Sequence, residues 1–205
     1  MPSWLAGCKA WAWFGSRAPA RPLAEMKFAV VDVDLTGINV HRDRVTGIAA
    51  LPVSGGAYRI ADLRYARMPA PSAIDNGAGS QWRTDYLALR ESIAGSTIVT
   101  YNPAFVRHMI SRACRSHDLP VLDGEWIDLE AAAVVMGTQD NELTTMNYWL
   151  DKMKAAGRCP HDATYDVVAM AQLLQAVLAY SEDAGIDTLE SFGRLQAVRA
   201  WFRRR

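Results

Sequence analysis

The feature that most constrains the fold of this chain is a run of β-branched residues that ends in two acids. Residues 27–34 (KFAVVDVD) are almost continuously apolar up to the acids, and Gly37 follows soon after. Such a run is typical of a buried strand that ends at a turn. Asp32 and Asp34 are two positions apart, and alternate residues of a strand point to the same face. The sequence therefore predicts two carboxylates side by side at the end of a strand.

Two like charges on one face are unfavourable unless a cation lies between them. A divalent metal therefore explains the pair Asp32 and Asp34, because hard cations such as Mg²⁺ prefer carboxylate oxygens. The alternative is that Asp34 has left the strand and only caps the turn that leads into Thr36 and Gly37.

Strands and helices alternate along the rest of the chain. Further strands are expected at residues 44–53, 57–65, 96–101 and 126–129, and the first three strands are expected to be antiparallel neighbours. Asn102 is a good N-cap and Pro103 a good first helical residue, so a helix is expected to start there. The other helices expected from the spacing of apolar residues are 85–94, 129–136, 143–156 and 165–180. This order indicates an α/β fold, with helices on the faces of a mixed sheet.

Composition restricts the protein to a few classes. The chain has 205 residues, half of them hydrophobic, and a formal net charge of zero, so no global positive field attracts nucleic acid. Three cysteines without CxxC spacing argue against a disulfide framework and are typical of a cytoplasmic protein. No apolar run reaches the ~18 residues of a membrane span, and no signal peptide is expected.

Three segments are expected along the chain. Residues 1–26 form a Trp-rich extension and linker, residues 27–182 the main domain, and residues 183–205 an Arg-rich tail or helix. The tryptophans either dock a partner or pack back on the domain, and the arginines either contact phosphates or an acidic partner or are solvated. A protein partner at either extension and a homodimer both stay open.

A histidine and a carboxylate lie at the start of the last long helix, in residues 159–166 (CPHDATYD). Taken alone, Asp166 only compensates the helix dipole, and His161 is a cap or a packed residue. Taken with Asp32 and Asp34, they suit a two-metal site that cleaves a phosphodiester, with the histidine as general base.

At this point residues 27–180 resemble the 3′–5′ exonucleases of the DEDDh type, the family of RNase T and of the proofreading subunit of bacterial DNA polymerase III. The first motif of that family, Asp-x-Glu followed by Thr-Gly, is matched at residues 32–37. The second, His-Asn-x-x-Phe-Asp, is matched at residues 101–106, and the third, His-x-Ala-x-x-Asp, at residues 161–166. The resemblance implies a ribonuclease H-like five-stranded sheet, with three antiparallel strands first and parallel strands after them.

The resemblance also implies a hydrolase that uses Mg²⁺ or Mn²⁺ to remove nucleotides from the 3′ end of single-stranded DNA or RNA. It assigns three metal ligands, one general base and five residues around the terminal nucleotide. In that order they are Asp32, Asp34 and Asp166, then His161, and then Leu35, Thr36, Gly37, Asn102 and Phe105.

The chain departs from the family at several positions. The glutamate of the first motif is Asp34, and the histidine and aspartate of the second motif are Tyr101 and Val106. Gly47 stands where the first long strand of the family carries an acid. Valine cannot bind a metal, so activity is expected to be weakened. The alternative is a catalytically inactive family member that binds nucleic acid or a protein partner.

Overall fold

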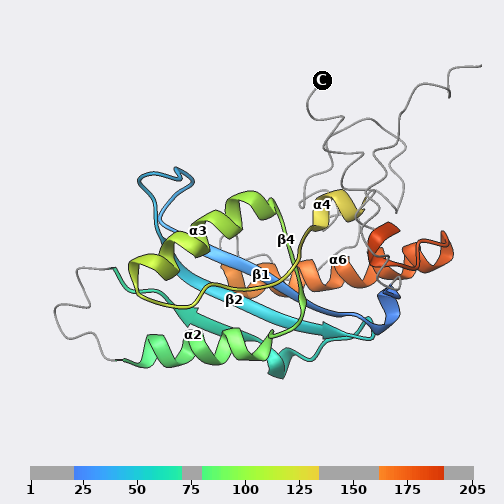
Figure 1. The fold of residues 1–205 in the computed structure, drawn as a ribbon, viewed down its shortest axis with the longest axis horizontal. Helices are drawn as coiled ribbons and strands as arrows, with labels where there is room; N and C mark the ends of the chain where they lie inside the picture. The colour runs from blue at the N-terminus through green and yellow to red at the C-terminus, as the bar shows by residue number, and fades with distance from the viewer. Residues whose placement is uncertain (1–20, 71–79, 134–161, 192–205) are drawn as a thin grey trace, which may run out of the picture.

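A mixed sheet organises the domain in a computed structural model that describes residues 21–70, 80–133 and 162–191 (Figure 1). β1 pairs antiparallel with β2, and β2 pairs antiparallel with β3, whereas β4 runs parallel to both β1 and β5. The strand order is β3-β2-β1-β4-β5, which confirms the predicted fold class. The strands are β1 (Lys27–Leu35), β2 (Val45–Ser54), β3 (Arg64–Arg67), β4 (Thr97–Thr100) and β5 (Trp126–Asp128).

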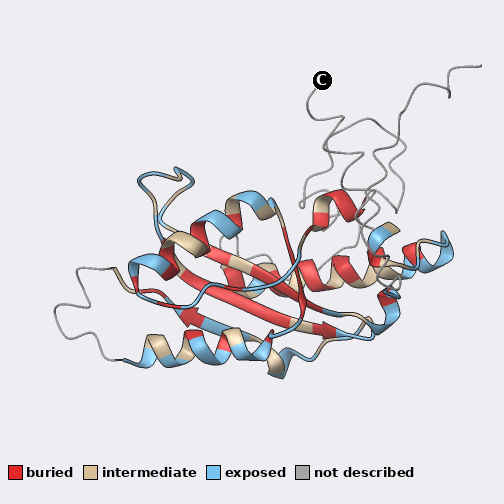
Figure 2. Ribbon diagram, in the orientation of Figure 1, coloured by how far each residue is buried: buried red, intermediate tan, exposed pale blue. Residues whose placement is uncertain are grey.

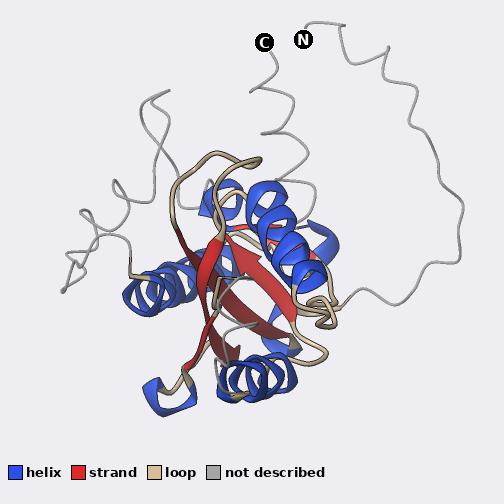
Figure 3. Cartoon of the chain, turned by 90° about the vertical axis from the view of Figure 1, so that its left-hand side faces the viewer, coloured by secondary structure: helices blue, strands red, loops and turns tan. Residues whose placement is uncertain are grey.

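Helices cover both faces of this sheet (Figure 3). One face packs against α6 (Ala163–Asp183) and the short α4 (Leu129–Ala132). The other face packs against α2 (Gln81–Ser92) and α3 (Pro103–Ser116). The central strands are buried between these layers (Figure 2).

Side chains of β1 alternate between the two apolar layers. Phe28 and Val30 belong to the layer under α6, whereas Ala29, Val31 and Val33 belong to the layer under α2 and α3. Because this alternation has a period of two, Asp32 and Asp34 continue the α6 face of the strand. The two acids are therefore carried toward α6 at the carboxyl end of β1.

The third strand differs from its prediction at residues 57–65. Ala57 and Ser54 close a tight turn through mutual backbone hydrogen bonds, and the chain then leaves the sheet. A single 3₁₀ turn, η2 (Ile60–Asp62), follows, and the guanidinium of Arg64 donates to the carbonyls of Ala61 and Leu63. The strand therefore starts only at Arg64, and it forms one edge of the sheet.

The predicted helices differ from the structure mainly at their ends. α2 begins at Gln81, before the predicted start at residue 85, and α6 begins at Ala163, before the predicted start at residue 165. α3 starts at Pro103 as expected, but Asn102 has a φ of 50° and its side chain does not cap the helix. The predicted helix at 143–156 lies outside the described residues, as do most of the Trp-rich and Arg-rich segments.

The segments before β1 and after α6 pair with each other. The amide of Leu23, in the 3₁₀ turn η1 (Leu23–Glu25), donates to the carbonyl of Asp187 at 2.7 Å. The amide of Leu189 donates to the carbonyl of Arg21 at 3.1 Å, and both leucines are buried in the α6 layer. These residues are thus packed on the core. Within the described ranges, no helix has the length and apolar character needed to cross a membrane.

Candidate active site

Asp34 remains within β1, where it pairs with Gly47 of β2, and the register shifts only after it. The alternative that Asp34 caps the following turn is therefore wrong. Asp43 has that role instead: its carboxylate accepts the Thr36 hydroxyl at 3.0 Å and the Asn39 amide at 2.8 Å.

The carboxylate of Asp34 joins three elements. Its Oδ1 accepts the backbone N–H of Ala163, the first residue of α6, at 2.8 Å. Its Oδ2 accepts the hydroxyl of Tyr65, on β3, at 2.9 Å. The start of α6 is thus fixed against the end of β1, which brings the third sequence motif to the first.

Asp32 lies in the most unusual electrostatic environment of the site. Burial, the charge of Asp166 and the charge of Asp34, in that order of importance, raise the pKa of Asp32 to about 7, against a partly opposing hydrogen bond from the backbone at Val33. The structure therefore brings Asp166 and Asp34 near enough to Asp32 for each of them to oppose its charge. A protein normally relieves such repulsion with a proton or a cation.

Asp166 occupies the first turn of α6, but it does not cap the helix. The cap is Asp162, whose Oδ1 accepts the amide of Thr164 at 2.9 Å and its hydroxyl at 2.5 Å. These bonds lower the pKa of Asp162. Because Asp162 already satisfies the helix start, capping gives no reason for a further acid at residue 166.

The carboxylates of Asp32, Asp34 and Asp166 are the kind of ligand that a hard divalent cation prefers. No three His, Cys, Asp or Glu side chains in the described ranges form a complete metal-binding group, and His161 lies outside those ranges. Burial is the largest cause of the raised pKa of Asp32, and the charges of Asp166 and Asp34 add to it. A hard cation bound by the carboxylate oxygens would offset these charges. Asp34 already accepts two hydrogen bonds, but a carboxylate has about four lone-pair positions, so it retains capacity for an ion.

The residues expected around the terminal nucleotide lie beside the carboxyl end of β1. Leu35 and Phe105 pack against the same apolar layer, under α2 and α3. Thr36 and Gly37 belong to the turn that Asp43 organises, and Asn102 is exposed at the start of α3. Their contacts with a nucleotide stay predictions.

Arg112 of α3 anchors that turn from the helix side. Its guanidinium donates to the backbone carbonyls of Val40 and Asp43. The turn that carries Thr36 and Gly37 is therefore held by α3 as well as by its own hydrogen bonds.

Val106 is built into the core. Its side chain is 4% exposed and belongs to the apolar layer that also contains Met109 and Ile110. The position where the resembling family has a carboxylate is therefore an apolar packing position here.

Tyr65 is a site residue that the sequence reasoning missed. Burial and its hydrogen bond to Asp34 raise the pKa of Tyr65 to about 12, so it stays a hydroxyl donor at neutral pH. The signal that could have found it is Gly47. A glycine inside a strand often marks the close approach of another group.

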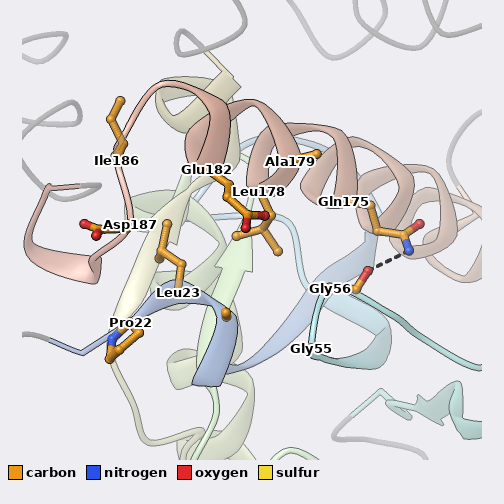
Figure 4. Close-up of a pocket in the computed structure, with 11 residues that line it drawn as sticks. Pro22, Leu23, Gly55, Gly56, Gln175, Leu178, Ala179, Glu182, Ile186 and Asp187 are labelled. Carbon is orange, nitrogen blue, oxygen red and sulfur yellow. Dashed lines mark hydrogen bonds between the residues drawn. The ribbon is translucent and has the colours of Figure 1, made fainter.

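Two cavities lie along α6. The first, of about 490 Å³, adjoins the first turns of the helix and is lined by Ile60, Leu63, Thr164, Tyr165, Val168, Ala169 and Gln172. The second, of about 340 Å³, adjoins the last turns, where the Gln175 amide donates to the carbonyl of Gly56 at 2.7 Å (Figure 4). Since a helix rises 1.5 Å per residue, Gln175 lies about 13 Å along α6 from Asp166. Neither of these two cavities has Asp32, Asp34 or Asp166 among its lining residues.

Comparisons with known proteins find likeness in structure only. No protein-family model and no curated protein sequence matches the chain. Exonuclease I of E. coli, solved with a dT13 oligonucleotide, matches with a TM-score of 0.57 and 13% identity, over 78% of this chain and 42% of that chain. Exonuclease X, solved with 5′-overhanging duplex DNA, matches with a TM-score of 0.53 and 16% identity, over 80% and 99%.

The nuclease domain of 3′hExo, described as a DEDDh family member and bound to rAMP, matches with a TM-score of 0.54 and 13% identity, over 77% of this chain and 94% of that domain. The chain thus spans less than half of exonuclease I and nearly all of exonuclease X. The chain has the ribonuclease H-like fold that these exonucleases share, and the resemblance to the DEDDh type predicted from its three motifs is confirmed in fold.

Proposed function

We propose that this chain is a metal-dependent nuclease that removes nucleotides from the 3′ end of single-stranded DNA or RNA. The observation that carries the proposal is the partly buried carboxylate of Asp32, whose pKa is raised to about 7 by burial and by its neighbours Asp166 and Asp34. Strongly perturbed carboxylates of this kind cluster at functional sites. The fold shared with exonucleases that were solved with DNA or a nucleotide supports the same reading.

In this proposal, Asp32 and Asp166 hold Mg²⁺ or Mn²⁺, and Asp34 contributes through its remaining lone pairs. When bound, the ion supplies Lewis-acid stabilisation of the reacting phosphate and lowers the pKa of water. His161 takes the proton from the attacking water.

The remaining residues orient the substrate. Leu35, Thr36 and Gly37 receive the terminal nucleotide, and Asn102 and Phe105 form the wall beside it. Asp43 and Arg112 keep the turn after β1 in one conformation through their hydrogen bonds. A pre-formed turn reduces the ordering cost of binding.

Degradation of a 5′-labelled single strand tests the proposal. We expect the wild-type chain to shorten the strand from its 3′ end in Mg²⁺ or Mn²⁺, and EDTA to stop it. Asp32→Ala is expected to abolish the reaction, and His161→Ala to slow it by about 100-fold or more. Asp187→Ala replaces an exposed acid beside the second cavity, at the last turns of α6. It is the matched control and should leave the cleavage rate unchanged. Cleavage that survives Asp32→Ala would reject the site.

A second candidate is a protein that binds the strand without cleaving it. The observation that favours it is the burial of Val106 where a further metal-binding carboxylate would be expected. This candidate predicts retention of the labelled strand by the wild-type chain, with no shortening in either metal. Binding with metal-dependent shortening would exclude it.

A further inference from the structure

We infer that Tyr65 is a positioning residue of the carboxylate site, which holds Asp34 in the orientation that a cation requires. The inference rests on the proposed function, because it assumes that Asp34 contributes to the binding of a metal. Tyr65 comes from β3, at the edge of the sheet, and none of the three sequence motifs contains it.

The hydrogen bonds of Asp34 fix its carboxylate plane. The Tyr65 hydroxyl donates to Oδ2 at 2.9 Å, and the Ala163 amide donates to Oδ1 at 2.8 Å. One donor is a side chain from the edge strand and the other is the first backbone amide of a helix, so the carboxylate links both elements to β1. Such partners orient ligating carboxylates, and their loss typically costs 10–100-fold in metal affinity or activity.

Gly47 provides the space in which Tyr65 reaches Asp34. A Cβ at residue 47 would lie 2.1 Å from the Tyr65 hydroxyl oxygen and 2.5 Å from Cζ, well inside contact distance. Gly47 also pairs directly with Asp34 across β1 and β2. The phenol therefore crosses the β2 backbone at the one register position where no side chain intervenes. Tyr65 has 40% of its surface exposed, so deep burial does not fix its side chain. The space over Gly47 and the hydrogen bond to Asp34 place the phenol instead.

Two substitutions disturb this arrangement independently. Tyr65→Phe keeps the ring and removes only the donor, and Gly47→Ala leaves the donor but displaces it. Tyr180→Phe, at an exposed tyrosine near the far end of α6, is the matched control. Asp34→Ala, alone and combined with Tyr65→Phe, tells whether Tyr65 acts through Asp34.

The experiment measures Mn²⁺ affinity of the full chain by calorimetry, together with kcat and KM on the labelled strand. We expect Tyr65→Phe and Gly47→Ala to weaken Mn²⁺ binding by about 10-fold or more, and to lower kcat while KM for the strand changes little. Tyr180→Phe should match the wild-type chain. In the Asp34→Ala background, adding Tyr65→Phe should change nothing further.

Different failures have different meanings. If the wild-type chain binds Mn²⁺ and cleaves but Tyr65→Phe matches it, the role of Tyr65 is overturned and the proposed function stands. The role is also overturned if Tyr65→Phe costs as much in the Asp34→Ala background as in the wild-type chain. If the wild-type chain neither binds Mn²⁺ nor cleaves, the proposed function fails, and the inference about Tyr65 falls with it.

Discussion

Asp32 favours its protonated form in the folded chain, because burial and two neighbouring carboxylates oppose its charge. The pKa of Asp32 is about 7 in the folded chain, against 3.8 for a freely exposed aspartate. Between these values the folded state binds more protons than the unfolded state, so its stability falls as pH rises. The carboxylate that serves the site thus costs stability at neutral pH when no cation is present.

The first prediction concerns Asp32→Asn in EDTA. This variant does not titrate at residue 32, so at pH 8 it should be more stable to urea than the wild-type chain by about 2–4 kcal/mol. The difference should shrink steadily toward pH 4, and in a separate assay with Mn²⁺ the variant should show no nuclease activity. Asp187→Asn is the control. If the stability of Asp32→Asn and that of the wild-type chain depend on pH in the same way in urea unfolding, the environment described for Asp32 is contradicted.

The second prediction concerns Val106, which is buried in an apolar layer. Val106→Asp places a charge where no partner is expected, so it should lower the free energy of unfolding by at least about 2 kcal/mol. His108→Asp, at an exposed position two residues along the same helix, should cost much less. If Val106→Asp unfolds at the same urea concentration as the wild-type chain, residue 106 faces the solvent-filled site.

At the scale of elements, the start of α6 is the point where the helix and the sheet meet. Asp162 caps the helix by accepting the amide of Thr164, and Asp34 of β1 accepts the amide of Ala163, the first residue of the helix. The helix is therefore fixed at the end that carries Asp166.

The third prediction is that Asp162→Ala lowers stability by about 1 kcal/mol at pH 7. Hydrogen bonds from Thr164 hold the pKa of Asp162 below 3.8, so its contribution is present above that pH. It is lost as pH falls through the lower folded value. Thermal unfolding from pH 7 to pH 2.5 should show the two chains converging. Asp183→Ala, at the other end of α6, should cost no stability; a similar cost there would argue against a specific cap.

The turn between β1 and β2 is a second element, and side-chain hydrogen bonds hold its conformation. Arg112 links it to α3 through the carbonyls of Val40 and Asp43. The fourth prediction is that Arg112→Met speeds amide hydrogen exchange in residues 36–44 and raises KM for the strand, because the turn is no longer held for the nucleotide. Arg115→Met, at an exposed position three residues further along α3, is the control. Unchanged exchange in residues 36–44 would mean that the turn orders itself.

At the scale of the whole molecule, local patterns predicted the frame of the site. Residues 27–34 specify β1 through their β-branched run, and the two-residue spacing puts Asp32 and Asp34 on one face. Pro103 marks the start of α3, and the acid at residue 166 lies in the first turn of the last long helix. These features depend on residues that are close together in the sequence, so one amino-acid sequence is enough to predict them.

Contacts between distant residues were not predictable in the same way. Tyr65 reaches Asp34 from another strand, across Gly47, and only the register of three strands reveals it. The burial of Val106 depends on which face of α3 meets the sheet. The third strand was placed too early because its apolar residues resemble a strand, although the tight turn at Ser54 takes them out of the sheet.

An anomalous difference map from a crystal of the wild-type chain soaked in Mn²⁺ shows directly whether the carboxylates at the end of β1 and the start of α6 bind a metal. We expect one well-occupied ion in contact with Asp32 and Asp166, and no such ion in a crystal of Asp32→Ala. An empty map at Asp32, or two fully occupied ions despite the apolar side chain at Val106, would contradict this expectation.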